Sequence, residues 1–179
     1  EKDSNIILDS IFYDDFPSVG PDENFRDINF DNYPEGNLKR SIINLKGKTS
    51  KLETLSSQCC EFATVNPKFL GLKASYSWMA CTDKKIGNAP LQAIKKINLN
   101  TKEEISWSAA PSGFVSEPIM VPSKASNKED DGYIFVLLWN GRRRGSDLVI
   151  LDAKDLKELA TYELPISIPH GLHGSWVNN

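Results

Sequence analysis

Residues 133–152 read YIFVLLWNGRRRGSDLVILD, and this stretch decides the fold class of the chain. It holds two runs rich in β-branched and aromatic residues, Tyr133–Asn140 and Asp147–Asp152, on either side of a segment bounded by Gly141 and Gly145. Such runs around a glycine-bounded turn indicate two antiparallel strands joined by a hairpin. The three arginines between the glycines are interpreted as a solvated loop and receive no function.

Similar runs recur on both sides of this hairpin, separated by Gly, Pro, Asn and Asp. Only Ala153–Glu158, interpreted as a turn between strands, and Ser50–Ser56 are compatible with a helix. The sequence therefore predicts an all-β fold, and a sandwich, a barrel and part of a propeller all suit it. The other expected strands are Asn5–Tyr13, Leu38–Leu45, Ser75–Thr82, Gln92–Leu99, Glu103–Ser108, Pro118–Pro122 and Leu159–Leu164.

Composition narrows the class of protein. A length of 179 residues allows one domain with a core, and a net charge of -3 argues against a nucleic-acid partner. The three cysteines are odd in number and form no CxxC pair, which favours a reducing, cytoplasmic compartment. The adjacent thiols Cys59 and Cys60 are expected to be free, with at least one buried. No apolar stretch approaches the ~20 residues of a membrane span.

The chain has two histidines, His170 and His173, within the segment Ile168–Trp176. Chelation by both would require a helix, which the glycines and proline of this segment oppose. The residues alone complete neither a zinc site nor a serine-type triad. They indicate a histidine in a turn, beside glycines that leave room for a close approach by a metal or ligand.

Four segments are read together as motifs, and a fifth is a weaker one. The four are Phe114–Pro122, Glu129–Tyr133, Ser146–Ala153 and Pro169–Gly174. In order and spacing they resemble the carotenoid cleavage oxygenase family. The weaker segment comprises Cys60-Glu61-Phe62, Asn66-Pro67 and Gly71. It is similar to that family's Glu-Phe-Pro motif, although Ala63 stands where proline is usual.

The resemblance implies a fold and a metal site. The family fold is a seven-bladed β-propeller with antiparallel blades, which carries iron(II) on its axis between four histidines. Residues 1–179 are expected to be a single partial domain, the C-terminal blades, with the N-terminal part of the enzyme absent. His173 matches an iron ligand and His170 a variable position, while Glu117 and Glu61 match glutamates that orient ligand histidines.

These roles lead to a geometric expectation. A carboxylate that accepts the ring N–H directed away from a metal fixes the tautomer and orientation of the imidazole. Glu117 is expected to serve His173, with an oxygen about 2.6–3.2 Å from one ring nitrogen. Glu61 is expected to serve a histidine outside this chain, and His170 should lie further from the axis.

The implied function is an iron(II)-dependent dioxygenase that uses O₂ to cleave a conjugated carbon–carbon double bond of a carotenoid or apocarotenoid to carbonyl products. The partners would be O₂, an apolar polyene and, peripherally, a membrane surface; this chain alone should be inactive. Two alternatives stay open. One is cleavage of a stilbene or other phenylpropanoid, and the other is a non-catalytic β-rich binding or scaffold module.

Overall fold

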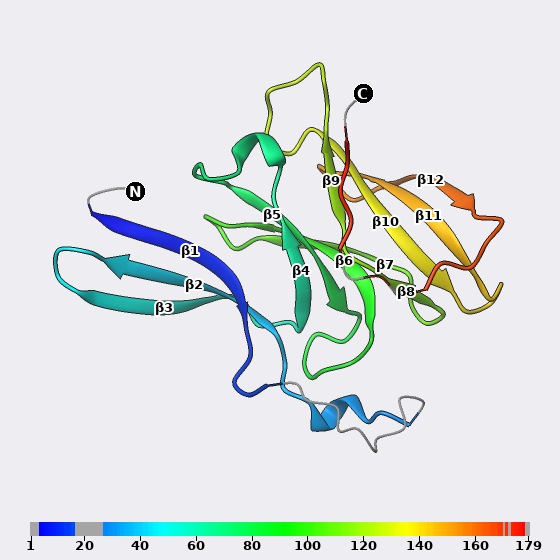
Figure 1. The fold of residues 1–179 in the computed structure, drawn as a ribbon, viewed down its shortest axis with the longest axis horizontal. Helices are drawn as coiled ribbons and strands as arrows, with labels where there is room; N and C mark the ends of the chain where they lie inside the picture. Colours follow the sequence, from blue (N-terminus) through cyan, green and yellow to red (C-terminus); the bar gives the residue numbers. More distant parts are fainter. Residues whose placement is uncertain (1–3, 17–26, 170, 172, 178–179) are drawn as a thin grey trace.

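The computed structural model describes residues 4–16, 27–169, 171 and 173–177. Within this part of the chain the elements are β-strands and two short 3₁₀ turns, η1 (Phe30–Asn32) and η2 (Pro67–Phe69). The strands form three antiparallel sheets that follow one another along the chain, with the second between the other two (Figure 1). The predicted all-β fold is confirmed.

Each sheet is built from neighbouring stretches of sequence, so short turns suffice to connect the strands. The first sheet has the order β1-β2-β3, the second β4-β5-β6-β7, and the third β12-β11-β10-β8 with β9 also on β10. The bounds are β1 Asn5–Phe12, β2 Asn37–Asn44, β3 Thr49–Ser56, β4 Cys60–Thr64, β5 Tyr76–Thr82, β6 Leu91–Asn98, β7 Glu104–Ser108, β8 Gly113–Val115, β9 Ile119–Pro122, β10 Gly132–Asn140, β11 Gly145–Asp152 and β12 Glu158–Glu163.

The structure corrects one expectation about local structure. Ser50–Ser56, compatible with a helix by sequence, belongs to strand β3, which pairs along its length with β2. Tertiary pairing overrides the weak local preference here, and the end of the strand is buried at Leu55 and Ser56. By contrast, the chain turns as expected within Ala153–Glu158, with Glu158 already the first residue of β12.

Two apolar cores join the three sheets. Between the second and third sheets, Trp78 and Ile94 pack with Ile134 and Val136, and all four side chains are fully buried. Trp78 also donates a hydrogen bond from Nε1 to the carbonyl oxygen of Ala153, at 2.9 Å. This core fixes the third sheet, which carries the site described below, against the second.

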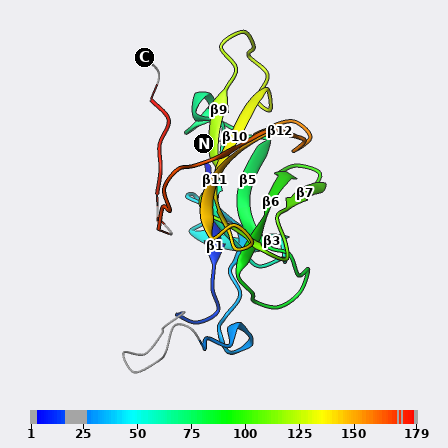
Figure 2. The same cartoon turned by 90° about the vertical axis from the view of Figure 1, so that its right-hand side faces the viewer.

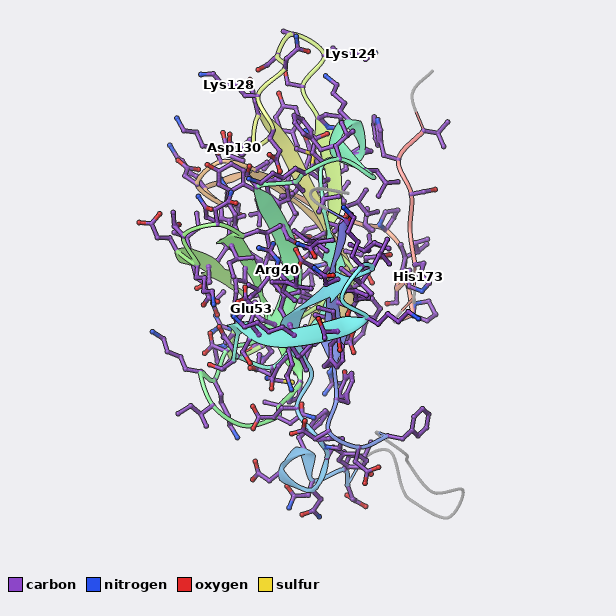
Figure 3. All side chains as sticks on the ribbon, turned by 90° about the vertical axis from the view of Figure 1, so that its left-hand side faces the viewer. Arg40, Glu53, Lys124, Lys128, Asp130 and His173 are labelled. Atoms are coloured by element: carbon purple, nitrogen blue, oxygen red, sulfur yellow. The ribbon has the colours of Figure 1, made fainter. Side chains whose placement is uncertain are left out.

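The other core lies between the first and second sheets and is supplemented by a hydrogen bond from Arg40. Its buried residues include Leu38 and Met79. Arg40 on β2, near the middle of Figure 3, binds both carboxylate oxygens of Asp9 at 2.7 and 2.8 Å. Its Nη1 also donates to the carbonyl oxygen of Leu99, at 3.2 Å, directly after β6. The apolar core and this hydrogen bond thus link the first sheet to the second, while the ion pair joins β1 and β2 within the first sheet.

The two end sheets keep apolar side chains exposed. On β1, Ile7 and Leu8 are 55% and 52% exposed, and on β12 Tyr162 is 57% exposed. The sheet between them instead buries Trp78 and Met79, neighbours on β5 that point to opposite faces and enter different cores. The first and third sheets therefore each leave apolar surface available for further packing.

All three cysteines are free and buried, as the sequence predicts for Cys59 and Cys60. Burial raises the pKa of the Cys60 thiol, and likewise that of Cys81, to about 12. Protonated buried thiols are poor nucleophiles and poor metal ligands, so these side chains act as core residues.

The part of the chain that the structure describes contains no helix with the length and apolarity needed to cross a lipid bilayer.

Gly132 starts β10 with a φ of 156°, a backbone conformation that residues with a side chain rarely adopt. A Cβ at this position would collide with the carbonyl oxygen of Val121 on the paired strand β9. We expect Gly132→Ala to lower the free energy of unfolding by about 1–3 kcal/mol, measured by denaturant titration. Gly87→Ala is the control, because it also has positive φ but its added Cβ would meet no atom within 4 Å. Equal losses for the two variants would show that φ alone matters.

Candidate functional site

The segment after β12 runs along the outer side of the third sheet, and it carries His173 (Figure 2). Ser146 on β11 anchors its first part, since the Ile168 amide donates to Ser146 Oγ at 2.8 Å. Further along, the rings of Trp176 and Phe135 meet edge to face with centroids 5.4 Å apart. These contacts on either side of His173 place it next to strands β8 and β9.

His173 contacts Glu117. Its Nδ1 lies 3.3 Å from Oε1 of that carboxylate, just beyond the range expected from the sequence. The other oxygen, Oε2, accepts a hydrogen bond from the amide of Gly174 at 2.7 Å. The carboxylate therefore binds both the imidazole and the backbone that follows it, although His173 is 76% exposed (Figure 3).

Glu117 is positioned by the break between strands β8 and β9, which both pair with β10. Ser116 closes this break, because its amide donates to the Leu137 carbonyl oxygen at 3.0 Å and its hydroxyl to the same atom at 2.9 Å. Pro118 follows and fixes its own φ. The side chain of Glu117 is only 22% exposed, in keeping with a carboxylate held toward a partner.

Phe62 on β4 of the second sheet also contacts His173. Its ring meets the imidazole of His173 edge to face, with centroids 6.0 Å apart and an interplanar angle of 82°. Phe62 has a φ of 56°, in the left-handed region, at the irregularity where β4 changes register against β5. A strained backbone that directs a ring onto a candidate ligand is consistent with a functional position.

Glu61 precedes Phe62 on β4, and its carboxylate is held by donors within this chain. Tyr13 donates its hydroxyl to Oε1, and the Phe62 amide donates to Oε2 at 3.2 Å. The structure thus brings Glu61 close to His173 through Phe62, but Glu61 itself binds Tyr13. Sequence reasoning missed Tyr13 and Phe62 as site residues, because no local pattern links Tyr13 to a residue 48 positions away.

A pocket of about 220 Å³ opens beside the imidazole. Glu117 and His173 line it together with apolar side chains of the third sheet and of the C-terminal segment. Those apolar residues include Ile119, Phe135, Leu137, Leu148 and Trp176. The pocket beside His173 is thus lined mainly by apolar side chains.

The geometry allows one kind of metal chemistry. With Nδ1 directed at a carboxylate, a neutral imidazole keeps its lone pair on Nε2, where it can coordinate a metal. Among the described residues, no group of three or more His, Cys, Asp and Glu side chains could hold a metal ion. The described part of the chain therefore offers one imidazole that could coordinate a metal, with a carboxylate on its other ring nitrogen; His170 lies outside the described residues.

Comparison with solved structures defines the class. The structure of a point mutant of Synechocystis apocarotenoid oxygenase matches with a TM-score of 0.96 at 42% identity, over 100% of this chain and 38% of that chain. A cobalt-substituted form of the same oxygenase matches equally well. The three sheets are therefore part of a β-propeller, as the resemblance predicted.

The family follows from the sequence comparison. The family model for the retinal pigment epithelial membrane protein matches residues 1–178, and the chain belongs to this family of carotenoid oxygenases. Apocarotenoid-15,15'-oxygenase of Synechocystis is 43% identical over 98% of this chain. Lignostilbene-alpha,beta-dioxygenase isozyme III of Sphingomonas paucimobilis is 32% identical over 72% of it. The chain spans 36% and 29% of the lengths of these two relatives.

Proposed function

We propose that this chain is one part of an iron(II)-dependent dioxygenase that cleaves a conjugated carbon–carbon double bond of a carotenoid or apocarotenoid to two carbonyl products. The observation that carries the proposal is the pairing of His173 Nδ1 with Glu117, which leaves Nε2 for a metal. The high identity to an apocarotenoid oxygenase supports the choice of substrate. Residues 1–179 then form a single partial domain, the C-terminal blades of the enzyme.

The residues present fit iron(II) as one corner of a larger site. Imidazole is a suitable ligand for iron(II), and a carboxylate behind the ring raises its basicity. The sequence has two histidines, so at least two ligands of a four-histidine site must come from polypeptide outside this chain. The existence of a cobalt-substituted form of the solved relative agrees with a replaceable metal in that protein.

Each part of the site has its own task in this proposal. When bound, the iron supplies a place where O₂ can be activated next to the polyene. Glu117 holds His173 in one tautomer and orientation, and the Gly174 amide in turn holds Glu117. The apolar side chains around the imidazole keep water away from this side of the metal. Without the remaining ligands, the chain alone does not catalyse the reaction.

The chemistry of the substrate suggests where the protein works. A long polyene partitions into lipid, so we propose peripheral contact with a membrane surface, and the free cysteines favour a reducing, cytoplasmic compartment. The substrate reaches the site from that surface, and O₂ is the second substrate.

A second candidate substrate is a stilbene. The 32% identity to a lignostilbene dioxygenase over 72% of the chain favours it, since both reactions cleave a double bond conjugated to an extended π-system. The site residues within this chain serve either substrate in the same way, because they act on the metal ligand.

The test uses the protein that carries this chain, prepared free of iron by chelation. We expect no cleavage before iron(II) is restored and, after it, two carbonyl products from an apocarotenoid in the presence of O₂. Product masses with ¹⁸O₂ show that the oxygen atoms come from O₂. Undiminished cleavage by the iron-free protein would refute the iron dependence, and cleavage of a stilbene alone would select the second substrate.

A further inference from the structure

The tyrosine that follows β1 reaches from the first sheet to a carboxylate of the second. Tyr13 donates its hydroxyl to Glu61 Oε1, and the two residues lie 48 positions apart in sequence. Both side chains are half-buried. A charge-assisted hydrogen bond between groups of different sheets is stronger than a neutral one and restrains both partners.

The backbone around this contact leaves room for the tyrosine ring. A Cβ on Gly36 would lie 2.8 Å from Tyr13 Cζ and 2.8 Å from the carbonyl oxygen of Cys60. The Cys60 amide donates to the Gly36 carbonyl oxygen at 2.8 Å, so Gly36 is itself fixed beside β4. The absence of a side chain at Gly36 is therefore what allows the ring of Tyr13 to approach Glu61.

Tyr13 serves as a donor in this contact. Burial, and after it the hydrogen bond to Glu61, raises the pKa of the Tyr13 hydroxyl above its ordinary value. The hydroxyl thus stays protonated at neutral pH and can act as a hydrogen-bond donor. A protonated phenol fixes the direction of the carboxylate without neutralising its charge.

The second oxygen of Glu61 is also held, by the amide of a residue whose ring contacts the candidate iron ligand His173. Oε2 accepts the Phe62 amide at 3.2 Å, and the ring of Phe62 contacts the imidazole of His173. Each carboxylate oxygen retains a further lone pair for another donor. The plane and position of the carboxylate are therefore set before any partner from outside this chain arrives.

We propose that Tyr13 is a positioning residue, which holds Glu61 in the orientation needed to accept the ring N–H of a metal-bound histidine outside this chain. The inference rests on the proposed function, because it assigns Glu61 to a ligand of the same iron. Tyr13 acts only through Glu61 and touches neither the substrate nor the metal.

Tyr13→Phe tests this in the protein that carries the chain, since it keeps the ring and removes the hydroxyl. We expect the iron(II) affinity and kcat to fall about tenfold, with KM unchanged; this is the lower end of the effect seen when a residue that orients a metal ligand is removed. In Glu61→Gln the iron(II) affinity and kcat should fall further, by about 10–100-fold. The double variant Tyr13→Phe/Glu61→Gln should match Glu61→Gln alone, because Tyr13 then has no carboxylate to hold.

A readout independent of activity is the ultraviolet absorbance of tyrosinate during alkaline titration. In the wild type Tyr13 should ionise well above the ordinary tyrosine pKa of about 10. Glu61→Gln should bring this ionisation back toward the ordinary value, whereas Tyr13→Phe should remove it. Tyr162→Phe, at an exposed tyrosine of β12, is the matched control and should leave iron affinity and kcat unchanged.

The outcomes separate the two proposals. Additive losses in the double variant, or an unchanged iron affinity in Tyr13→Phe, would overturn the role of Tyr13. If the wild type binds iron(II) but cleaves no polyene, the proposed function fails, while the iron affinities of the variants still decide on Tyr13. A wild type that retains no iron would overturn both.

Discussion

The variant His173→Ala is expected to lose iron and to cleave its polyene more than roughly 100-fold more slowly than the wild type, because a direct ligand matters more than the residues that orient it. His173 combines an imidazole, a carboxylate beside one of its ring nitrogens and a largely exposed side chain. Iron content by metal analysis and product formation at saturating substrate measure the two effects.

Glu117→Gln is the companion variant and should be milder. The amide retains the size of the side chain but loses its charge, so iron affinity or activity should fall by about 10–100-fold. His170→Ala is the matched control, because the resemblance places that histidine at a variable position. Full iron content in His173→Ala, or equal losses at His170 and His173, would contradict the assignment of the ligand.

The largest expected loss of stability concerns the core between the second and third sheets. Trp78 is fully buried there, and we expect Trp78→Ala to lower the free energy of unfolding by about 3–5 kcal/mol. The cost combines lost apolar burial, the cavity left behind and an unpaired Ala153 carbonyl oxygen. Denaturant titration followed by circular dichroism measures it.

Two further variants identify the cause of that loss. Trp78→Phe keeps much of the ring but removes the hydrogen bond, so a smaller loss of about 1–3 kcal/mol is expected. Ile86→Ala, at a side chain that is 85% exposed, should change stability by less than about 0.5 kcal/mol. A Trp78→Ala variant as stable as Ile86→Ala would show that the sheets do not depend on this core.

The strands with clear periodicity could be predicted from the sequence. The hairpin of β10 and β11 and the strands β5 and β6 lie within one or two residues of their expected bounds, since long apolar runs between turn residues leave few other conformations. Strands β4 and β8 were not predicted. Strand β4 contains an irregularity at Phe62, and β8 spans only Gly113–Val115. Their structure depends on the strands they pair with.

The site divides in the same way. Glu117 and His173 could be paired in advance because the resemblance assigned a role to each, and the structure brings them into contact. Tyr13 and Gly36 carry no local signal, because their importance arises only where β4 passes the first sheet. Contacts between sheets depend on distances that a linear pattern does not contain.

The uncovered apolar side chains of β1 and β12 have a practical consequence for anyone who expresses residues 1–179 by themselves. Two exposed apolar surfaces at opposite ends of one molecule allow molecules to associate head to tail. Such association does not form closed oligomers, so the assemblies grow as the protein concentration rises. Light scattering should accordingly detect particles whose mass rises as the sample is concentrated. Charged replacements at Ile7 and Tyr162, one on each surface, are the natural first step toward a monodisperse sample.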